Sequence, residues 1–477
     1  MSLEIKKSMS NIINNLNPPK EEIDSLICLY KNGKFQDVLD KTEQMVLKYS
    51  FSIFLYNLRG SANALLNRYD LAVECYRNAS RINPNYAAIY NNLGNVFKEK
   101  GNIESAKINY KKAIKLKPNY PEAYYGLGLT LEKNGEFLSA ITSYENALNK
   151  NPNYSEVYFN LGNVYRKRGD YDLATKNYLS AINLKKNYYE ACCNLGNTKK
   201  DLGDIVSARF YYKKALKINP QDFETMWNMH GVSFSINEAI EWLLKCLRTE
   251  KKSLKARLML AALKYLQNDK IDFNNLMKSN FKNHPFMRSF SWLFELEKKP
   301  KLFFNKFNLF DYTIKNSLLH RPFYEFGVWK GTSFKYLLKR FKKGFGFDTF
   351  TGLPENWYNE KAGTYSSDGI IPNVKGGKFI KGEFKNSLPK FFKKNRQLAS
   401  LINFDADLYS STLCALENCK KIIDENTILI FDEFIMSEEW EKDEFKALNE
   451  FCMKNNLLYE VIAVSLFSKQ VAVKVKK

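Results

Sequence analysis

The chain has 477 residues, which is too long for one ordinary domain and predicts two or three. Its hydrophobic content of 45% and aromatic content of 15% allow packed cores and exclude a wholly disordered chain. The formal charge of +22 favours anionic partners, but Lys residues interspersed with Glu and Asp along the whole chain favour a generally basic surface over one binding patch.

Cysteine usage and the N-terminal stretch indicate a compartment. The eight cysteines are scattered through apolar periodic segments, and no C-x-x-C pair suggests zinc binding or thioredoxin-type chemistry. We therefore expect free thiols in a reducing environment. The first 22 residues contain no long apolar run typical of a signal peptide, and no apolar run reaches the length of a membrane span. These features predict a cytoplasmic protein without a membrane span.

A unit of 34 residues repeats through the first half of the chain. Its clearest mark is the tyrosine that ends Pro-Asn-Tyr or a related tripeptide, at Tyr86, Tyr120, Tyr154 and Tyr188. Leu-Gly, Ala, Tyr and Ala also recur at fixed places, in one unit as Leu93, Gly94, Ala106, Tyr110 and Ala113. A fixed period of this length predicts a solenoid of helical hairpins. Small residues let the two helices approach closely, and proline ends the second helix.

This pattern resembles the tetratricopeptide repeat, W-x2-L-G-x2-Y…A-x3-F…A…P, with Tyr in place of Trp. The resemblance covers roughly residues 19–222, opens with a weaker unit and is followed by an irregular one after Phe223. Tetratricopeptide repeats generally hold protein partners, so the resemblance implies a protein or peptide partner here and no catalytic chemistry.

Asparagine recurs at two equivalent places in three of the units. These residues are Asn92 and Asn95, Asn160 and Asn163, and Asn194 and Asn197. Amide side chains stacked along the inner groove would be able to hold the backbone of an extended peptide. The alternatives are hydrogen bonds between adjacent repeats, or simple tolerance of Asn on a polar face.

The repeat fades after Phe223, although helical periodicity continues to about residue 320. The aromatic-rich stretch at 285–312 is expected to pack against both neighbouring regions rather than to bind a ligand. We divide the chain into an N-terminal segment (1–18), a repeat solenoid (19–256), a helical bridge (257–300) and a C-terminal domain (301–477).

From Arg321 onward, short apolar runs alternate with helical segments. Strands are expected at 323–328, 344–350, 378–384, 398–407, 427–434, 458–464 and 470–476. This alternation predicts an α/β domain with a parallel sheet covered by helices on both faces. The last two strands are joined by only "SLFSK", which is too short for a crossover, so they must pair antiparallel. Such a sheet is the plan of the Rossmann-like class I methyltransferase fold.

The motif "YEFGVWKGTS" follows the pattern of a strand, a glycine turn and a helix. Gly327 and Gly331 would let a ligand approach the backbone, and the helix N-terminus would suit a carboxylate or phosphate. Asp348 ends the next strand, where it is placed to accept hydrogen bonds from ribose hydroxyls. This geometry serves NAD enzymes and S-adenosylmethionine enzymes alike.

Two later apolar runs each end in a pair of acids. Asp405 and Asp407 follow one run, and Asp432 and Glu433 follow the other. Because parallel strands place their carboxyl ends at one edge, these carboxylates would repel one another unless a cation lies between them. Oxygen ligands favour Mg²⁺ or Mn²⁺ over zinc. The alternative is that the acids cap the helices that follow each strand.

Taken in chain order, "EFGVWKGTS", "FDTFTGLPE", "KGEFKNSLP", "FDADLYSSTLCALE" and "ILIFDEF" resemble the macrocin O-methyltransferase family of S-adenosylmethionine-dependent enzymes. The resemblance implies cofactor contacts at Glu325, Gly327, Val328, Trp329, Gly331 and Asp348. It also implies a divalent metal held by Asp405, Asp432 and Glu433. The family more often has Asp or Asn at the last of these places.

The expected reaction is methyl transfer to a hydroxyl of a sugar or other small metabolite. Binding to the metal would lower the pKa of that hydroxyl, Asp405 or Asp407 would take its proton, and the oxyanion would attack the sulfonium methyl. Tyr409 and the segment 351–377 are candidates for acceptor contacts, the segment as an active-site lid or as an ordinary surface insertion.

Two other functions remain open from the sequence. A protein docked on the repeats would be the methyl acceptor in the first, and a repeat adaptor would carry an inactive methyltransferase-like domain in the second. Nucleic acid is not the expected partner, because no Asn/Asp-Pro-Pro-Tyr motif occurs and the basic charge is diffuse.

Overall fold

The computed structural model describes residues 17–358 and 360–476, so most of the predicted N-terminal segment lies outside the described residues. Contacts between residues divide the chain into two compact units. The first runs up to Tyr165 and also includes Lys176–Lys186, and the second comprises Arg166–Thr175 and the residues from Asn187 onward. The domain boundaries expected at 256 and 300 stay predictions.

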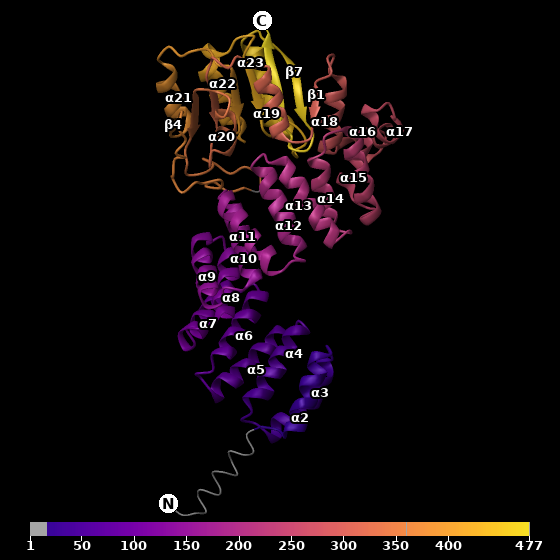
Figure 1. Cartoon of the computed structure of the whole chain (residues 1–477), viewed down its shortest axis with the longest axis vertical. Helices are drawn as coiled ribbons and strands as arrows, with labels where there is room; N and C mark the ends of the chain where they lie inside the picture. The colour runs from indigo at the N-terminus through magenta and orange to yellow at the C-terminus, as the bar shows by residue number, and fades with distance from the viewer. Residues whose placement is uncertain (1–16, 359, 477) are drawn as a thin grey trace, which may run out of the picture. The chain divides into compact units, whose positions relative to one another are not determined.

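The predicted helical hairpins are confirmed in the repeat region, which is indigo to magenta in Figure 1. The helices are α2 (Lys20–Lys31), α3 (Phe35–Lys48), α4 (Ile53–Leu65), α5 (Tyr69–Ile82), α6 (Ala87–Glu99), α7 (Ile103–Leu116), α8 (Pro121–Lys133), α9 (Phe137–Lys150), α10 (Ser155–Lys167), α11 (Tyr171–Leu184), α12 (Tyr189–Asp201), α13 (Ile205–Ile218), α14 (Phe223–Gly231), α15 (Ile236–Thr249) and α16 (Leu254–Leu266). Successive hairpin turns contain a glycine with positive φ, at Gly101, Gly135, Gly169 and Gly203.

Each hairpin is closed by a glycine of the first helix that faces a tyrosine ring of the second. The pairs are Gly60 with Tyr76, Gly94 with Tyr110, Gly128 with Tyr144, Gly162 with Tyr178 and Gly196 with Tyr212. A Cβ atom at any of these glycines would lie 2.5–2.7 Å from the ring, closer than real side chains come. All five tyrosines are buried. The recurring glycine is therefore required by the ring that packs on it.

The rest of the chain forms a sheet and the helices around it. The elements are α17 (Ile271–Met277), η1 (Asn280–Asn283), α18 (Pro285–Glu295), β1 (Lys301–Phe303), α19 (Lys306–Lys315), β2 (Phe323–Phe326), α20 (Thr332–Leu338), β3 (Gly344–Asp348), β4 (Gly377–Lys381), α21 (Phe384–Phe392), β5 (Leu401–Phe404), α22 (Tyr409–Cys419), η2 (Lys420–Ile422), β6 (Ile428–Phe431), η3 (Trp440–Lys442), α23 (Glu444–Lys454), β7 (Leu458–Ser465) and β8 (Val471–Lys476). The seven expected strands are all present as β2 to β8. The three-residue β1 was not predicted, because it is too short to show a period of two.

The sheet is mixed and has the strand order β1-β7-β8-β6-β5-β2-β3-β4. Strands β4, β3, β2, β5 and β6 pair in parallel, and β8 runs antiparallel to both β6 and β7. The antiparallel pairing of the last two strands, expected from their short connection, is confirmed. The crossover from one side of β2 to the other places the carboxyl ends of β2 and β5 next to each other.

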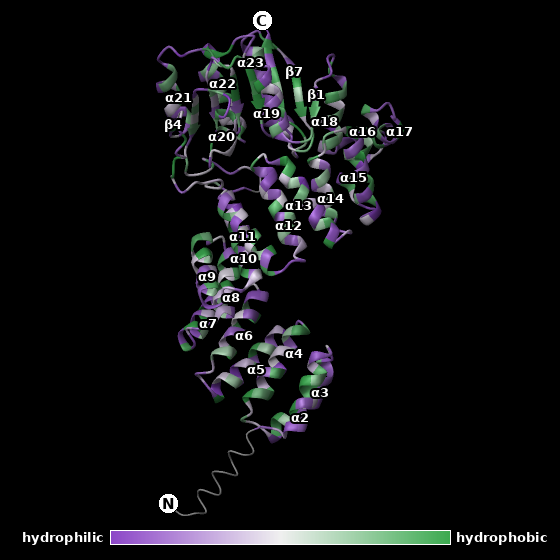
Figure 2. Cartoon of the chain, in the orientation of Figure 1, coloured by the Kyte–Doolittle hydropathy of each residue, from purple (hydrophilic) through white to green (hydrophobic). Residues whose placement is uncertain are grey.

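Helices cover both faces of the sheet. One apolar cluster joins alternate strand residues, such as Phe326 and Phe404, to α21, α22, α23 and α18. The other joins the intervening residues, such as Phe323 and Ile430, to α19 and α20. Aromatic residues of the stretch 285–312 pack into both clusters, as expected. In Figure 2 the strands are mostly green and therefore apolar, whereas the repeat helices combine green and purple residues.

Candidate active site

Four phenylalanines align across neighbouring strands near the carboxyl ends of those strands. Phe326 pairs with Phe347 and with Phe404, Phe404 pairs with Phe431, and the paired rings stack at 4.8–5.4 Å. The residues that follow them therefore form the next row, which consists of Gly327, Asp348, Asp405 and Asp432. Because neighbouring strands lie about 4.8 Å apart, this register brings the predicted strand-end residues together.

The loop after β2 depends on the glycine at 327. Its φ is +85°, and a Cβ there would lie 1.7 Å from the carbonyl oxygen of Asp405 on the neighbouring strand. No other residue fits this close approach. The next two backbone N–H groups, of Val328 and Trp329, both donate to one carboxylate oxygen of Asp348 at 2.7 Å.

Asp348 fastens this loop to the end of β3. Its second oxygen, Oδ1, accepts a hydrogen bond from the N–H of Phe350 at 2.6 Å. The carboxylate thus orients three backbone N–H groups on two loops. A carboxylate has about four acceptor positions, and the hydroxyl of Thr349 reaches Oδ1 at a long 3.5 Å, so the ribose hydroxyls expected from the sequence would have to compete with this contact. Contact with ribose stays a prediction.

Glu325 lies one residue before the phenylalanine row and is buried on β2. Asn403 donates to Oε1 at 3.3 Å, while Oε2 has no hydrogen-bond partner among the described residues. Burial raises the pKa of this carboxyl to about 8. Its unpartnered oxygen suits a cationic or hydrogen-bonding ligand group, but Glu325 does not line the cavity described below. Gly331 also lies outside it and opens α20 with a φ of +75°.

Burial and the repulsion of neighbouring carboxylates favour the protonated forms of Asp405 and Asp407. Burial first, then the charges of Asp432 and Glu433, raise the pKa of Asp407 to about 7. Burial and Asp432 also raise the pKa of Asp405 well above its ordinary value. A carboxyl with a pKa near 7 is suited to accept a proton at neutral pH. Two carboxyls of this site are therefore candidates for proton transfer.

Lys306, at the start of α19, is a cation that faces these acids. Burial alone would lower the pKa of its ammonium group, but the carboxylates of Asp432 and Asp405 outweigh burial and raise it. The ammonium in turn lowers the pKa of Asp405, against the effects of burial and of Asp432. The chain thus supplies some of the positive charge that the acids require.

The predicted metal ligands have partners of their own. Lys469 contacts both carboxylate oxygens of Glu433 at 3.2 Å, and the amide of Gln470 donates to Asp432. In the described part of the chain, no three His, Cys, Asp or Glu side chains converge so as to hold a metal ion. The oxygen chemistry of Asp405, Asp432 and Glu433 fits Mg²⁺ or Mn²⁺, but their arrangement as it stands does not. The metal stays a prediction.

A cavity of about 590 Å³ lies over this edge of the sheet. Its volume is in the range of sites for small molecules and cofactors. Of the residues predicted from the sequence, the lining includes Gly327, Val328, Trp329, Asp348, Asp405, Asp407, Asp432 and Glu433. The segment 351–377 borders the cavity through Gly352, Leu353, Pro354, Glu355, Trp357 and Tyr365. Tyr409 is not in the lining, and its hydroxyl donates to Glu450 on α23.

Other lining residues carry no signal in the sequence. Tyr171 and Asp201 come from repeat helices, and Lys306 comes from the region before the cofactor motif. At the place of Tyr171 two other repeats have Ile103 and Ile205, so the repeat pattern does not mark this position. Finding these residues requires tertiary contacts. None of the three histidines lines the cavity.

The repeated asparagines mainly bind other repeat residues. Asn92 donates to Asn57 of the preceding repeat at 2.9 Å, and Asn160 donates to the hydroxyl of Tyr125 at 2.8 Å. The second asparagine of each pair accepts the hydroxyl of a buried tyrosine in its own hairpin: Tyr110 to Asn95, Tyr178 to Asn163 and Tyr212 to Asn197. The first asparagine of two pairs thus bonds to the adjacent repeat, which is one of the expected alternatives, and the second bonds within its own hairpin. Peptide binding stays a prediction.

Comparison with known proteins identifies the repeats. Family models described as "TPR repeat" match residues 60–101, 94–135 and 162–203, and models described as "Tetratricopeptide repeat" match 121–154, 143–176 and 189–222. Residues 60–222 are therefore tetratricopeptide repeats. These matches end before the sheet, and none of them names a methyltransferase. No curated protein matches the chain.

Solved structures resemble part of the chain. MamA is 28% identical and matches 34% of this chain and 95% of its own, with a TM-score of 0.33. The C-terminal part of a TPR repeat-containing protein from Cytophaga hutchinsonii is 20% identical and matches 50% and 98%, with a TM-score of 0.42. YrrB, a TPR protein with an unusual peptide-binding site, is 21% identical and matches 39% and 95%, with a TM-score of 0.34.

The described ranges 17–358 and 360–476 contain no candidate for a membrane-spanning helix. None of the helices there combines the length and the apolar character that crossing a bilayer requires.

Proposed function

We propose that this chain is an S-adenosylmethionine-dependent O-methyltransferase of the cytoplasm, acting on a hydroxyl of a sugar or other small metabolite. The observation that carries the proposal is an acid-lined cavity directly over the glycine loop of β2. Eight carboxylates border it, at Asp201, Asp348, Glu355, Glu383, Asp405, Asp407, Asp432 and Glu433, against the two lysines Lys306 and Lys385.

The charge of this cavity distinguishes between NAD and S-adenosylmethionine, the two cofactors that the sequence motif allows. The chain as a whole has a formal charge of +22, so an acidic cavity is not a consequence of its general composition. The pyrophosphate of NAD would face carboxylates here and no lining arginine. S-adenosylmethionine carries a sulfonium and an ammonium group, which these acids would attract. The cavity therefore favours the sulfonium cofactor.

The sheet supports the same proposal. Five parallel strands with β2 between β3 and β5, followed by an antiparallel strand inserted beside β6, agree with the class I methyltransferase plan expected from the sequence. In that fold ligands bind at the carboxyl ends of the strands, where the row from Gly327 to Asp432 lies. The short strand β1 extends the sheet beyond this plan on the side of β7.

The residues of the site divide into two roles. The loop of Gly327, Val328 and Trp329, oriented by Asp348, forms the cofactor side of the cavity. S-adenosylmethionine, when bound, supplies the methyl group and leaves as S-adenosylhomocysteine. On the other side Asp407, with a pKa of about 7, accepts the proton of the acceptor hydroxyl as the oxygen–methyl bond forms. Holding the two reactants in line supplies much of the rate.

Lys306 balances the charge during this proton transfer. Asp405 and Asp407 are both buried with Asp432 nearby, so each additional ionised carboxyl costs free energy. The ammonium of Lys306 offsets part of that cost. The binding of Mg²⁺ or Mn²⁺ expected from the sequence stays a prediction. The roles of Asp348, Asp407 and Lys306 described above do not depend on it.

The repeats complete the proposal as the part that holds a protein or peptide partner, which is the general role of tetratricopeptide repeats. The partner would carry or make the acceptor. The acceptor itself is proposed to be a small molecule or glycan.

Calorimetric titration of S-adenosylmethionine into the full chain, with and without Mg²⁺, tests the proposal. We expect the wild type to bind and Asp348→Ala to lose binding, because the loop then loses the carboxylate that orients its N–H groups. Asp424→Ala is the matched control, since Asp424 is equally half-buried but ion-paired with Arg321 away from the cavity. Absence of binding by the folded wild type would overturn the proposal and favour a repeat adaptor.

A further inference from the structure

One hairpin turn of the repeats belongs by its contacts to the unit that contains the sheet. Residues Arg166–Thr175 group with that unit, although the residues on either side of them, up to Tyr165 and Lys176–Lys186, group with the earlier repeats. This segment ends α10, contains the turn at Gly169 and begins α11. Its separation from its own neighbours indicates that the turn is held from the side of the sheet.

The close contact at Gly169 explains this grouping. A Cβ at Gly169 would lie 2.8 Å from the ring of Trp329 and 2.8 Å from the side chain of Lys330. The equivalent turn of the preceding repeat, at Gly135, has nearly the same φ, +79° against +72°, and nothing within 4 Å of the same position. The two glycines therefore share a backbone conformation and differ only in what they touch.

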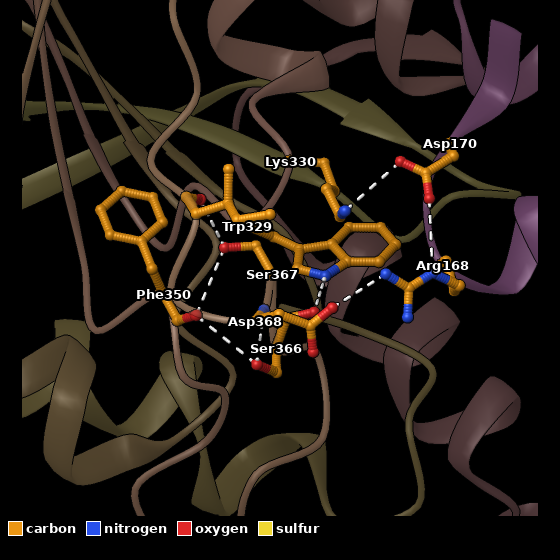
Figure 3. A network of polar contacts seen from close by, with 9 residues as sticks. Arg168, Asp170, Trp329, Lys330, Phe350, Ser366, Ser367 and Asp368 are labelled. Carbon is orange, nitrogen blue, oxygen red and sulfur yellow. Dashed lines mark hydrogen bonds and ion pairs between the residues drawn. The ribbon is translucent and has the colours of Figure 1, made fainter. Parts of the chain in front are cut away.

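Charged side chains extend the contact on both sides of this turn. Arg168 forms an ion pair with Asp368 at 2.8 Å, and Lys330 forms one with Asp170 at 3.3 Å (Figure 3). Arg168 also contacts Asp170 at 3.5 Å, so the four charges form one alternating network. The side chains of Arg168 and Lys330 are only 17% and 19% exposed, which makes these pairs less screened than ordinary surface pairs.

Trp329 lies between the repeat turn and the segment expected to act as a lid. Its indole N–H donates to the carbonyl of Ser366 at 3.2 Å (Figure 3). Its ring also meets that of Tyr365 edge to face. The backbone of Trp329 is in the left-handed region, with a φ of +46°, which is uncommon for a non-glycine residue. A conformation of this kind persists when its surroundings hold it.

The residue after this turn reaches the cavity itself. Tyr171 lines it, together with Asp201 at the end of the next hairpin's first helix. Asp201 is fixed by Arg166, whose guanidinium donates to it at 2.7 Å. Burial, then the charge of Asp201, raise the pKa of the Tyr171 phenol to about 12, so it stays a hydrogen-bond donor at neutral pH.

We propose that the repeat turn Arg168–Tyr171 is a working part of the cofactor cavity: Gly169 and its two charged neighbours position the Trp329 loop, and Tyr171 supplies a hydrogen-bonding wall. The assignment to a cofactor rests on the function proposed above. The positioning of the loop does not, because it follows from contacts within the chain alone. The repeats then serve the reaction directly, in addition to holding a partner.

Gly169→Ala and Gly135→Ala in the full chain form a matched pair. Both impose the same left-handed strain on alanine, but only Gly169→Ala pushes against Trp329 and Lys330. We expect hydrogen exchange to become faster at 328–332 and 364–368 in Gly169→Ala alone. We also expect the affinity for S-adenosylmethionine to fall about tenfold in Gly169→Ala and to stay within about twofold in Gly135→Ala.

The two readouts separate the two proposals. Equal hydrogen exchange in both variants would overturn the positioning role, whether or not the cofactor binds. Faster exchange in Gly169→Ala with unchanged cofactor affinity would overturn the role in the cavity. A wild type that binds no S-adenosylmethionine would overturn the proposed function, and exchange at 328–332 would then decide the positioning role by itself.

Tyr171→Phe tests the role of the Tyr171 hydroxyl in the cavity without disturbing the turn at Gly169. Tyr69→Phe is its control, because Tyr69 occupies the same place in an earlier repeat and its hydroxyl donates to Asn67, outside the cavity. In the same calorimetric titration, Tyr171→Phe should weaken the binding of S-adenosylmethionine several-fold, whereas Tyr69→Phe should leave it unchanged. An affinity in Tyr171→Phe equal to that of the wild type would overturn the contribution of its hydroxyl.

Discussion

The buried tyrosines of the repeats and two buried glutamates of the unit that contains the sheet differ in how their oxygens are bonded. In the repeats, buried tyrosine hydroxyls donate to asparagine or glutamate side chains of the same hairpin. In the unit that contains the sheet, Glu325 on β2 and Glu444 at the start of α23 each keep a buried carboxylate oxygen without a partner among the described residues. Satisfied polar groups specify a structure, whereas unsatisfied ones cost stability and are retained where they serve a ligand or a proton.

Tyr144→Ala should have the largest effect, and it should destabilise the repeats. The ring is fully buried and fills the space opposite Gly128, so its loss leaves a cavity that backbone shifts cannot close. We expect the free energy of unfolding of the repeats to fall by about 3–5 kcal/mol. Chemical denaturation followed by circular dichroism measures it. A loss below about 1 kcal/mol would contradict the role of the tyrosine ring in the hairpin.

Asp407→Asn should have the next largest effect, on the side of the sheet. Because the pKa of Asp407 is about 7, the wild-type rate should rise with pH through about 7 as this carboxyl ionises. Asparagine cannot accept the proton, so we expect kcat to fall about 10²–10⁴-fold and the pH dependence to disappear. Steady-state rates against pH measure both, with Asp424→Asn as control. A variant that keeps the wild-type pH profile would exclude Asp407 as the base.

Glu325→Gln tests whether an unsatisfied acid reduces stability. The folded pKa of Glu325 is about 8, above its ordinary 4.5, so the fold favours the protonated form. The Glu325 carboxyl therefore contributes to the free energy of unfolding in full below pH 4.5, and this contribution is lost as the pH rises through 8. Glutamine stays neutral, so the variant should gain roughly 2–4 kcal/mol over wild type at pH 9 and little at pH 4.5.

Thermal unfolding of both proteins across this pH range measures the difference. Glu43→Gln is the control, because Glu43 is exposed on a repeat helix and should give no pH-dependent gain. A gain from Glu325→Gln that does not change with pH would show that the carboxyl is not titrating in this range.

The sequence predicted what depends on local patterns or on register. The hairpins followed from a period of 34 residues, and the row of Asp348, Asp405 and Asp432 followed from acids placed directly after apolar strands. Tyr171 and Lys306 could not be predicted, because each reaches the cavity through contacts with residues more than 100 positions away in the chain. The pairing of Glu433 with Lys469, which lie 36 positions apart, was not predicted because it too depends on a tertiary contact.

The smallest expected effect separates the ring of a repeat tyrosine from its hydroxyl. Tyr110→Phe keeps the ring that packs on Gly94 and removes the hydroxyl, with its hydrogen bonds to Asn95 at 2.6 Å and to Thr130. We expect a loss of about 1 kcal/mol in the unfolding of the repeats. Tyr69→Phe, whose hydroxyl bonds at the surface, should lose less than about 0.5 kcal/mol.

The tetratricopeptide pattern has phenylalanine at the place of Tyr110, which agrees with a ring that matters more than its hydroxyl. If Tyr110→Phe cost as much as Tyr144→Ala, the hydroxyl network would be the main source of stability in the hairpins. The asparagines would then be required for folding, and their side chains would not be free to turn toward a peptide. A small loss leaves Asn95 replaceable at little cost, so that a partner is able to compete for its amide.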